Sequence, residues 1–265
     1  MNFKMLATSA LFIGGVLLAG NASAVVINDS GETTLQEILN GITVSNGDGC
    51  TSATGGCQSA VNVDTDQSNS ALWSIGGTGG SFSQIIIEIA GLADTNSFGI
   101  YDATNSGNRY TIFSGSDGAQ YTSLIGFFSD GEIWTGSPDM SGATGVTFAG
   151  NQFGFFLDNG STTYFSDRNL NGGTDRMVGF EGTGEDTVQP CLATSCDKYS
   201  TAPGDWLENE YVLAFEDGSD FDYNDFVVMV ESVKPVPEPG TLLLIGGGLV
   251  GIGAAGRRRR SRRRA

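Results

Sequence analysis

The feature that most constrains the fold is a pair of strand-like runs joined by an acidic turn, late in the chain. In the first run, 211–216, Tyr, Leu and Phe alternate with Val, Ala and Glu, which is the period-two pattern of a β-strand. The second run, 226–233, is again rich in β-branched residues. Acidic side chains crowd the residues between the two runs, so the sequence predicts a hairpin with a charged turn.

The turn is dense in oxygen ligands and lacks a neighbouring cation in the sequence. Five carboxylates and one amide fall within ten residues, and no Lys or Arg lies between Lys198 and Lys234. Ca²⁺ binds carboxylates, amides and carbonyls through six to eight oxygens. We therefore expect a calcium site here, and the alternative is a solvated acidic hairpin. The candidate ligands are Asp220, Asp222, Asn224 and Asp225, with help from Glu216 or Asp217.

The turn resembles only part of an EF-hand loop. Asp220, Asp222 and Asn224 have the spacing of its first half, and Glu231 falls at its twelfth position. However, Asp225 stands where an EF-hand needs glycine, and both flanks are predicted strands. We interpret the segment as a cation-binding β-turn.

The rest of the sequence predicts one or at most two domains of an all-β class, a β-sandwich or jelly roll. The chain has 265 residues with 40 Gly and 6 Pro, and it almost lacks long amphipathic helical runs. Between residues 61 and 149, short β-rich runs recur at an even spacing with Gly, Ser and Asn turns. One short helix is predicted over 34–40, where Thr34 and Glu37 have the capping-box spacing and Gly41 follows as the stop.

Composition excludes several function classes. The chain has no histidine, which removes Ser-His-Asp and Cys-His catalysis and His-ligated zinc. Residues 25–234 hold five basic against 29 acidic side chains, a net charge of −24. A body this acidic is not expected to bind nucleic acid or an anionic membrane surface.

Four cysteines lie in two loop-rich segments. Cys50 and Cys57 share one segment, and Cys191 and Cys196 share the other. In an exported chain they predict disulfides, for which three pairings exist. We favour the two local pairs, because each would close its own loop. Zinc is the competing interpretation, but neither CxxC spacing nor histidine supports it.

A second loop matches the start of a calcium-binding pattern. Asp167, Asn169 and Asn171 precede Gly172 with the D-x-[DN]-x-[DN]-G spacing, and Asp175 stands at the ninth position. The twelfth position is Val178, so the bidentate glutamate is missing. The loop is therefore either a second metal site or a set of Asx-turns without an ion.

Residues 151–233 resemble a domain of unknown function that is common in bacterial exported proteins. The resemblance rests on FGFFLDNG, YFSDRNLNGG, VGFEG and the closing YVLAFEDGSDFDYNDFVVMV. It implies a β-sandwich of extracellular adhesive or matrix proteins that binds calcium. Members often carry a histidine near the position of Arg176 and Met177, which this chain lacks.

Both ends of the chain read as targeting segments. Residues 1–24 have the basic start, apolar run and A-x-A site of a signal peptide, so signal peptidase should leave Val25 as the first residue. Residues 235–265 carry Pro237, Glu238 and Pro239, an apolar helix over 241–255, and an arginine-rich end. The apolar run is short for a membrane span, which takes about 20 residues, and a plain anchor would not explain the Pro-Glu-Pro.

The tail resembles a PEP-CTERM sorting signal. This resemblance implies a Gram-negative source, a precursor held transiently in the inner membrane, and cleavage by an exosortase-type enzyme. The product would reach the cell surface or an exopolysaccharide matrix. We expect a structural or adhesive, non-enzymatic protein in that matrix or biofilm. The alternative is a glycan-active enzyme that uses paired carboxylates.

Overall fold

The computed structural model describes residues 24–68, 70–76, 80–88, 95–117, 122–136, 142–189 and 203–237. In these ranges the regular structure is antiparallel β-sheet with one α-helix and one 3₁₀ turn, which confirms the all-β prediction. The predicted apolar helix 241–255, Cys191 and Cys196 lie outside the described residues. No helix within the described ranges is both long and apolar enough to cross a membrane.

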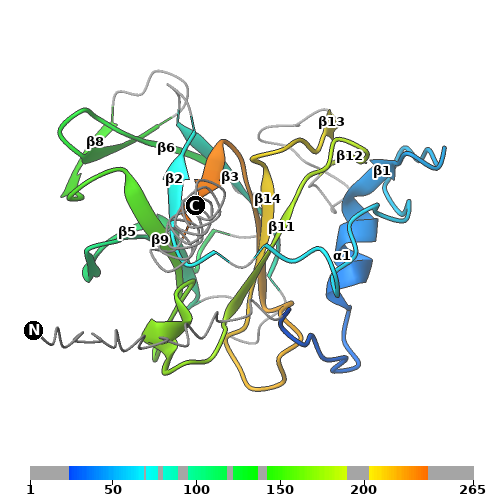
Figure 1. Cartoon of the computed structure of the whole chain (residues 1–265), viewed down its shortest axis with the longest axis horizontal. Helices are drawn as coiled ribbons and strands as arrows, with labels where there is room; N and C mark the ends of the chain where they lie inside the picture. Colours follow the sequence, from blue (N-terminus) through cyan, green and yellow to red (C-terminus); the bar gives the residue numbers. More distant parts are fainter. Residues whose placement is uncertain are drawn as a thin grey trace, which may run out of the picture. The chain divides into compact units, whose positions relative to one another are not determined.

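The larger sheet has seven strands and carries the closing hairpin near one edge (Figure 1). Every neighbouring pair in it is antiparallel. In spatial order its strands are β11 (Met177–Glu181), β14 (Tyr211–Phe215), β15 (Phe226–Val230), β3 (Ser81–Glu88), β6 (Thr122–Phe127), β7 (Glu132–Thr135) and β8 (Gly142–Thr147).

Two further sheets complete the fold. The first follows the order β16 (Val233–Pro235), β2 (Trp73–Ile75), β9 (Gln152–Asp158), β4 (Ser97–Asp102) and β5 (Asn105–Phe113), and β10 (Thr163–Phe165) also pairs with β9. The second is small and consists of β1 (Thr43–Ser45), β12 (Thr187–Val188) and β13 (Gly204–Asp205). Figure 1 shows α1 next to this small sheet.

Strand β14 is buried on both faces, and its alternation separates two cores. Tyr211, Leu213 and Phe215 join an aromatic core that also contains side chains of the sheet of β2, β4 and β9, including Trp73, Phe98 and Phe155. Val212 and Ala214 point into a second core, which they share with helix α1 (Leu35–Ile42). The hairpin sheet is thus the middle layer between another sheet and a helix-containing layer, as a sandwich with one extra layer requires.

Helix α1 confirms the predicted short helix and extends it by two residues. The side chain of Thr34 accepts from the N–H of Glu37, and the Glu37 carboxylate accepts from the N–H of Thr34, so the capping box is formed. Gly41 does not end the helix, because Ile42 is still needed as a buried contact of the second core. The four buried apolar side chains of the helix each contribute about 1.5–3 kcal/mol on burial; they are Leu35, Ile38, Leu39 and Ile42.

A disulfide closes the loop that follows α1 and β1. Cys50 and Cys57 are bonded, with their Cα atoms 5.8 Å apart, as the sequence predicted for this pair. The Cys57 side chain is buried, and its N–H donates to the carbonyl of Thr43. The bond therefore fastens the loop to β1, beside the second core.

Replacing both Cys50 and Cys57 with serine should lower the free energy of unfolding by about 2–3 kcal/mol, because the open loop gains entropy in the unfolded chain. Denaturant unfolding of the exported protein, with and without reductant, measures this loss. The double variant should be as stable as the reduced wild type and less stable than the oxidised wild type. If all three have the same free energy of unfolding, the prediction is wrong.

Candidate metal centre

The acidic residues lie in the loop that joins β14 to β15. Phe215 pairs with Phe226 at the end of the hairpin, so residues 216–225 must reverse the chain direction there. Because both strands are buried on both faces, the loop begins and ends at a fixed position. Residues 216 and 225 thus directly follow and precede a pair of hydrogen-bonded strands, which brings their carboxylates together.

Four carboxylates converge in this loop. Glu216, Asp220, Asp222 and Asp225 each place one oxygen so that these atoms all lie within 4.8 Å of one another. Glu216 and Asp222 are almost completely buried, at 0% and 2% exposure, whereas Asp220 is exposed. Two unit charges at this separation repel by roughly 3 kcal/mol at an effective dielectric constant of 20. A cation among the four would remove that cost.

The path of the loop follows from two residues with unusual backbone angles. Phe221 and Tyr223 both have positive φ, 59° and 56°, and they flank Asp222. Such conformations cost non-glycine residues about 1–2 kcal/mol each. The buried Tyr223 ring, whose hydroxyl donates to the carbonyl of Asp175 at 2.9 Å, belongs to the second core and helps to hold this path.

Backbone N–H groups orient three of the carboxylates. Glu216 accepts from the N–H of Gly218 at 2.9 Å, and Asp225 accepts from the N–H of Asp217 at 2.7 Å. Asp222 accepts from the N–H of Asn224 at 3.2 Å. These bonds leave lone pairs on the oxygens and fix the directions of the side chains, as outer hydrogen bonds do around metal ligands.

The N-terminal segment 24–33 closes over the loop. Asn28 bonds to it twice, from its N–H to the carbonyl of Phe221 at 2.8 Å and from its side-chain amide to the carbonyl of Asp220. The Ser30 hydroxyl donates to the Asp222 carboxylate. The sequence contained no signal for these contacts, which span more than 190 residues.

Asn224 has a side-chain oxygen that no described residue pairs with. Its amide nitrogen donates to the carbonyl of Thr33 at 3.0 Å and to the Asp222 carboxylate at 2.7 Å. Its Oδ1 atom is buried and has no hydrogen-bond partner among the described residues. An unsatisfied buried carbonyl costs about 1–3 kcal/mol. A hard cation bound beside Asp222 would satisfy it, so these residues fit a metal ion with oxygen ligands.

Arg176 corrects the expectation that no cation lies near the turn. This residue precedes β11, outside the interval between Lys198 and Lys234, and its Nη1 donates to the carbonyl of Gly218 at 2.6 Å. The same nitrogen lies 3.9 Å from Glu216 Oε1, and the guanidinium stacks over the rings of Tyr164 and Phe221. One guanidinium against four carboxylates still leaves a surplus of negative charge.

Burial raises the pKa values of several acids in the loop. Burial, with the negative charges of Asp217, Glu216 and Asp222 added, raises the pKa of Asp225 from 3.8 to about 7. The pKa of Glu216 is also raised, mainly by burial and then by Asp220. At neutral pH, deprotonating the full cluster therefore costs free energy unless a cation is bound.

Asp217 is not one of the four converging acids. Its carboxylate accepts from the amide of Asn96 at 3.1 Å, and burial raises its pKa. Of the two additional ligands expected from the sequence, the structure thus brings Glu216 into the cluster and points Asp217 toward Asn96, just before β4. Glu231, at the twelfth position, follows β15 and is not in the group of four.

In the second candidate loop, residues 167–175, the polar side chains make hydrogen bonds and ion pairs within the protein. Asp167 caps the 3₁₀ turn η1 (Arg168–Asn171) by accepting from the N–H of Asn169 at 2.8 Å, and the Asn169 amide donates to the same oxygen. Asn171 bonds to the backbone of Phe165 through both ends of its amide, while Asp175 lies 3.6 Å from Arg168. This is the Asx-turn arrangement that the sequence left as the alternative, and metal binding here stays a prediction.

Comparison with known families identifies the C-terminal tail. A family model described as the PEP-CTERM protein-sorting motif matches residues 235–260, which contain Pro237, Glu238 and Pro239. The predicted sorting tail is confirmed, and it indicates an exported protein whose membrane-anchored precursor is processed by an exosortase-type enzyme. Comparison with curated proteins and with solved structures finds no match. The resemblance of residues 151–233 to an exported domain stays a prediction.

The raised pKa values predict an inverse pH dependence of stability in the metal-free protein. Because the folded-state pKa of Asp225 is about 7 against an ordinary 3.8, the folded chain binds more protons than the unfolded chain between these values. The free energy of unfolding in chelator should therefore fall as the pH rises from about 4 to about 7. Urea unfolding at several pH values measures this slope, and Asp225→Asn should flatten it. A stability that rises across this window in wild type would contradict the assignment.

Proposed function

We propose that this protein is a calcium-binding structural or adhesive component of an extracellular matrix, which an exosortase-type system releases at the cell surface. The observation that carries the calcium assignment is the convergence of Glu216, Asp220, Asp222 and Asp225. Asn224, whose amide nitrogen bonds to Asp222 and whose Oδ1 is buried without a partner among the described residues, is a further candidate ligand. The sorting motif at 235–260 supports the extracellular location.

The ligand chemistry favours calcium over other metals. The four acids and Asn224 offer only oxygen, and the chain has no histidine, so zinc and copper lack their usual ligands. Magnesium keeps several waters and is usually bound through one or two carboxylates. A set of four carboxylates and an amide suits calcium, which accepts six to eight oxygens with variable geometry.

An ion in this loop would act as a structural staple. It would link the hairpin of β14 and β15 to the segment 24–33, because Ser30 contacts the same carboxylate of Asp222 that binds Asn224. It would also reduce the self-repulsion of a body with a net charge of −24. Both effects suit a protein that must persist outside the cell.

The alternative, a glycan-active enzyme, is less well supported by the cluster. Glycosidases hold two carboxyl groups about 5–9.5 Å apart with the sugar between them. Here four acids share one small volume, and both Glu216 and Asp222 are buried away from a polymer. We therefore propose a non-enzymatic role. Incubation of the purified protein with matrix polysaccharide should generate no new reducing ends, and their appearance would favour the enzyme.

Calcium should stabilise the protein beyond the effect of ionic strength. Extracellular calcium modules have dissociation constants on the order of 10⁻⁴–10⁻³ M, and ten times that concentration adds about 1.4 kcal/mol of stability. For a domain of this size, this raises Tm by about 3–5 °C. Thermal unfolding in calcium chloride and in sodium chloride at matched ionic strength separates ligation from screening.

The double variant Asp222→Asn and Asp225→Asn should lose the calcium-specific shift and keep the sodium response. A matched control is Asp48→Asn with Asp64→Asn, which removes two exposed charges whose carboxylates accept no hydrogen bond within the described structure. If all three proteins respond to calcium alike, the loop is only a solvated acidic turn, and the proposed staple is wrong.

The sorting motif predicts processing at both ends of the chain. Intact mass of the protein recovered from the cell surface should match a chain that begins at Val25 and lacks Arg257 to Arg264. Alanine at Pro237, Glu238 and Pro239 together should leave the precursor in the membrane fraction. Surface protein that keeps its arginine tail would contradict exosortase-type cleavage.

A further inference from the structure

Arg176 is the basic side chain that reaches the acidic loop. Four basic residues lie within the described ranges, and they are Arg109, Arg168, Arg176 and Lys234. Among these four, only Arg176 forms an ion pair with one of the converging acids, because its Nη1 atom lies 3.9 Å from Glu216 Oε1. One positive side chain of the protein itself therefore lies beside the carboxylates.

The sheet places Arg176 opposite Glu216. Met177 pairs with Phe215 in the ladder between β11 and β14, and the N–H of Glu216 donates to the carbonyl of Arg176 at 3.1 Å. The two residues thus continue the ladder by one step. Opposed residues of an antiparallel pair project to the same face, so the register of two buried strands brings the guanidinium to this carboxylate.

Two aromatic rings hold the guanidinium in place. Its Cζ atom lies 4.9 Å from the ring centroid of Tyr164 and 5.0 Å from that of Phe221. Stacking of this kind suits the planar guanidinium better than a lysine ammonium. The Arg176 side chain is 18% exposed and that of Glu216 is 0% exposed, so water and salt screen their charges little. Arg176 is therefore a fixed positive charge.

The charge of Arg176 affects any ion that the loop binds. When all four acids are deprotonated, they carry four negative charges, and the guanidinium leaves a surplus of three. Its pairing with Glu216 lowers the repulsion among the acids in the metal-free protein. The same charge repels a divalent ion that shares the Glu216 carboxylate. Both effects reduce the free energy that calcium binding releases.

We propose that Arg176 is a fixed counter-ion of the acidic loop, which stabilises the metal-free protein and lowers the affinity of the loop for calcium. The charge of the ligands and the rigidity of the site tune calcium affinity over several orders of magnitude. The guanidinium offsets one of the four carboxylates, which suits a site that responds to extracellular calcium concentrations. This inference rests on the proposed calcium site and names the residue that sets its affinity.

Removal of the positive charge tests the inference directly. Arg176→Gln should lower the calcium dissociation constant about tenfold, which corresponds to about 1.4 kcal/mol. Calorimetric titration of the exported, purified protein with calcium chloride, after removal of metal by a chelator, measures this change. In chelator the variant should unfold at a lower urea concentration than wild type, because it loses the ion pair, the hydrogen bond to Gly218 and two ring contacts.

Arg176→Lys separates the charge from the contacts. Lysine keeps the positive charge but lacks the planar group that stacks on two rings. This variant should be less stable than wild type in chelator and should bind calcium at least as tightly. If Arg176 only shapes the loop, the lysine and glutamine variants should both bind calcium more weakly. The lysine variant decides between these two roles even if Arg176→Gln does not fold.

Lys234→Gln is the matched control for net charge. It removes one positive charge from an exposed residue of β16, which follows the end of β15 opposite to the loop. At an ionic strength of about 0.15 M, exposed charges farther apart than about 8 Å are largely screened. At this ionic strength the control should therefore leave the calcium dissociation constant unchanged within about twofold.

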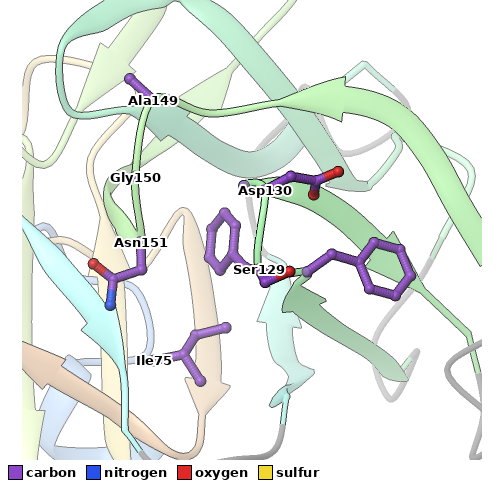
Figure 2. Close-up of a pocket in the computed structure, with 9 residues that line it drawn as sticks. Ile75, Ser129, Asp130, Ala149, Gly150 and Asn151 are labelled. Carbon is purple, nitrogen blue, oxygen red and sulfur yellow. The ribbon is translucent and has the colours of Figure 1, made fainter.

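A second control excludes calcium bound elsewhere. An open pocket on the body also offers side-chain oxygens, from Ser129, Asp130 and Asn151 (Figure 2). Asp130 is the only acid among the described residues that line it. Asp130→Asn combined with Arg176→Gln should keep the tightened calcium binding, whereas Asp222→Asn in the same background should remove it.

The outcomes distinguish this inference from the calcium site on which it rests. If wild type binds calcium and Arg176→Gln binds it equally or more weakly, the counter-ion role is overturned and the calcium site stands. Equal tightening by Lys234→Gln also overturns the role, because the effect would then be one of net charge. If neither wild type nor Arg176→Gln binds calcium, the proposed site and this inference are both wrong.

Discussion

The two-sided burial of the β14–β15 hairpin is the constraint on which the rest of this structure depends. Tyr211, Leu213 and Phe215 complete one core while Val212 and Ala214 complete another, so a shift of the strand by one residue would move each set into the core that fits the other. Because the register of the strands is fixed, the two ends of the loop between them are fixed as well. Acids that would otherwise spread in solvent are held within 4.8 Å of one another because their strands cannot move apart.

The sequence predicted what depends on local pattern. Period-two alternation predicts the strand β14, and the capping-box spacing of Thr34 and Glu37 predicts the helix α1. It also marked the acidic loop, because the ligands are close in the chain. The choice between Glu216 and Asp217 was open, since it depends on which way each side chain leaves the strand. The structure turns Asp217 toward Asn96 and keeps Glu216 in the cluster.

What the sequence did not predict depends on contacts between distant segments. Arg176, just before the neighbouring strand β11, reaches the loop, and Ser30 reaches it from a segment near the start of the described body. Nothing in the sequence around an arginine or a serine indicates which distant residue its side chain will contact. The loop that begins at Asp167 shows a different limit of sequence analysis. Its local pattern fits two structures, because the spacing that suits metal ligands also suits Asx-turns. Only the positions of Asn171, bonded to the Phe165 backbone, and of Asp175, beside Arg168, distinguish the two uses.

The described body begins and ends next to the points where processing is predicted. At one end, the N–H of Val25 donates to the Gln67 side chain at 2.7 Å, directly after the predicted signal-peptide site. At the other, Val233 to Pro235 pair with β2, and the N–H of Val236 donates to the carbonyl of Leu72. The Pro-Glu-Pro of the sorting motif begins at the next residue.

Cleavage beyond this point removes no strand and breaks no hydrogen bond of the described body. The segment 24–33 also closes over the acidic loop through Asn28 and Ser30, so cleavage of the predicted leader before Val25 would place the new chain start in the segment that contacts the candidate metal centre. If the proposed calcium site has the weak affinity typical of extracellular modules, it would fill at the calcium concentrations found outside cells rather than in the cytosol. Export and closure of the loop would then be coupled, because the ion and the free N-terminal segment become available in the same compartment.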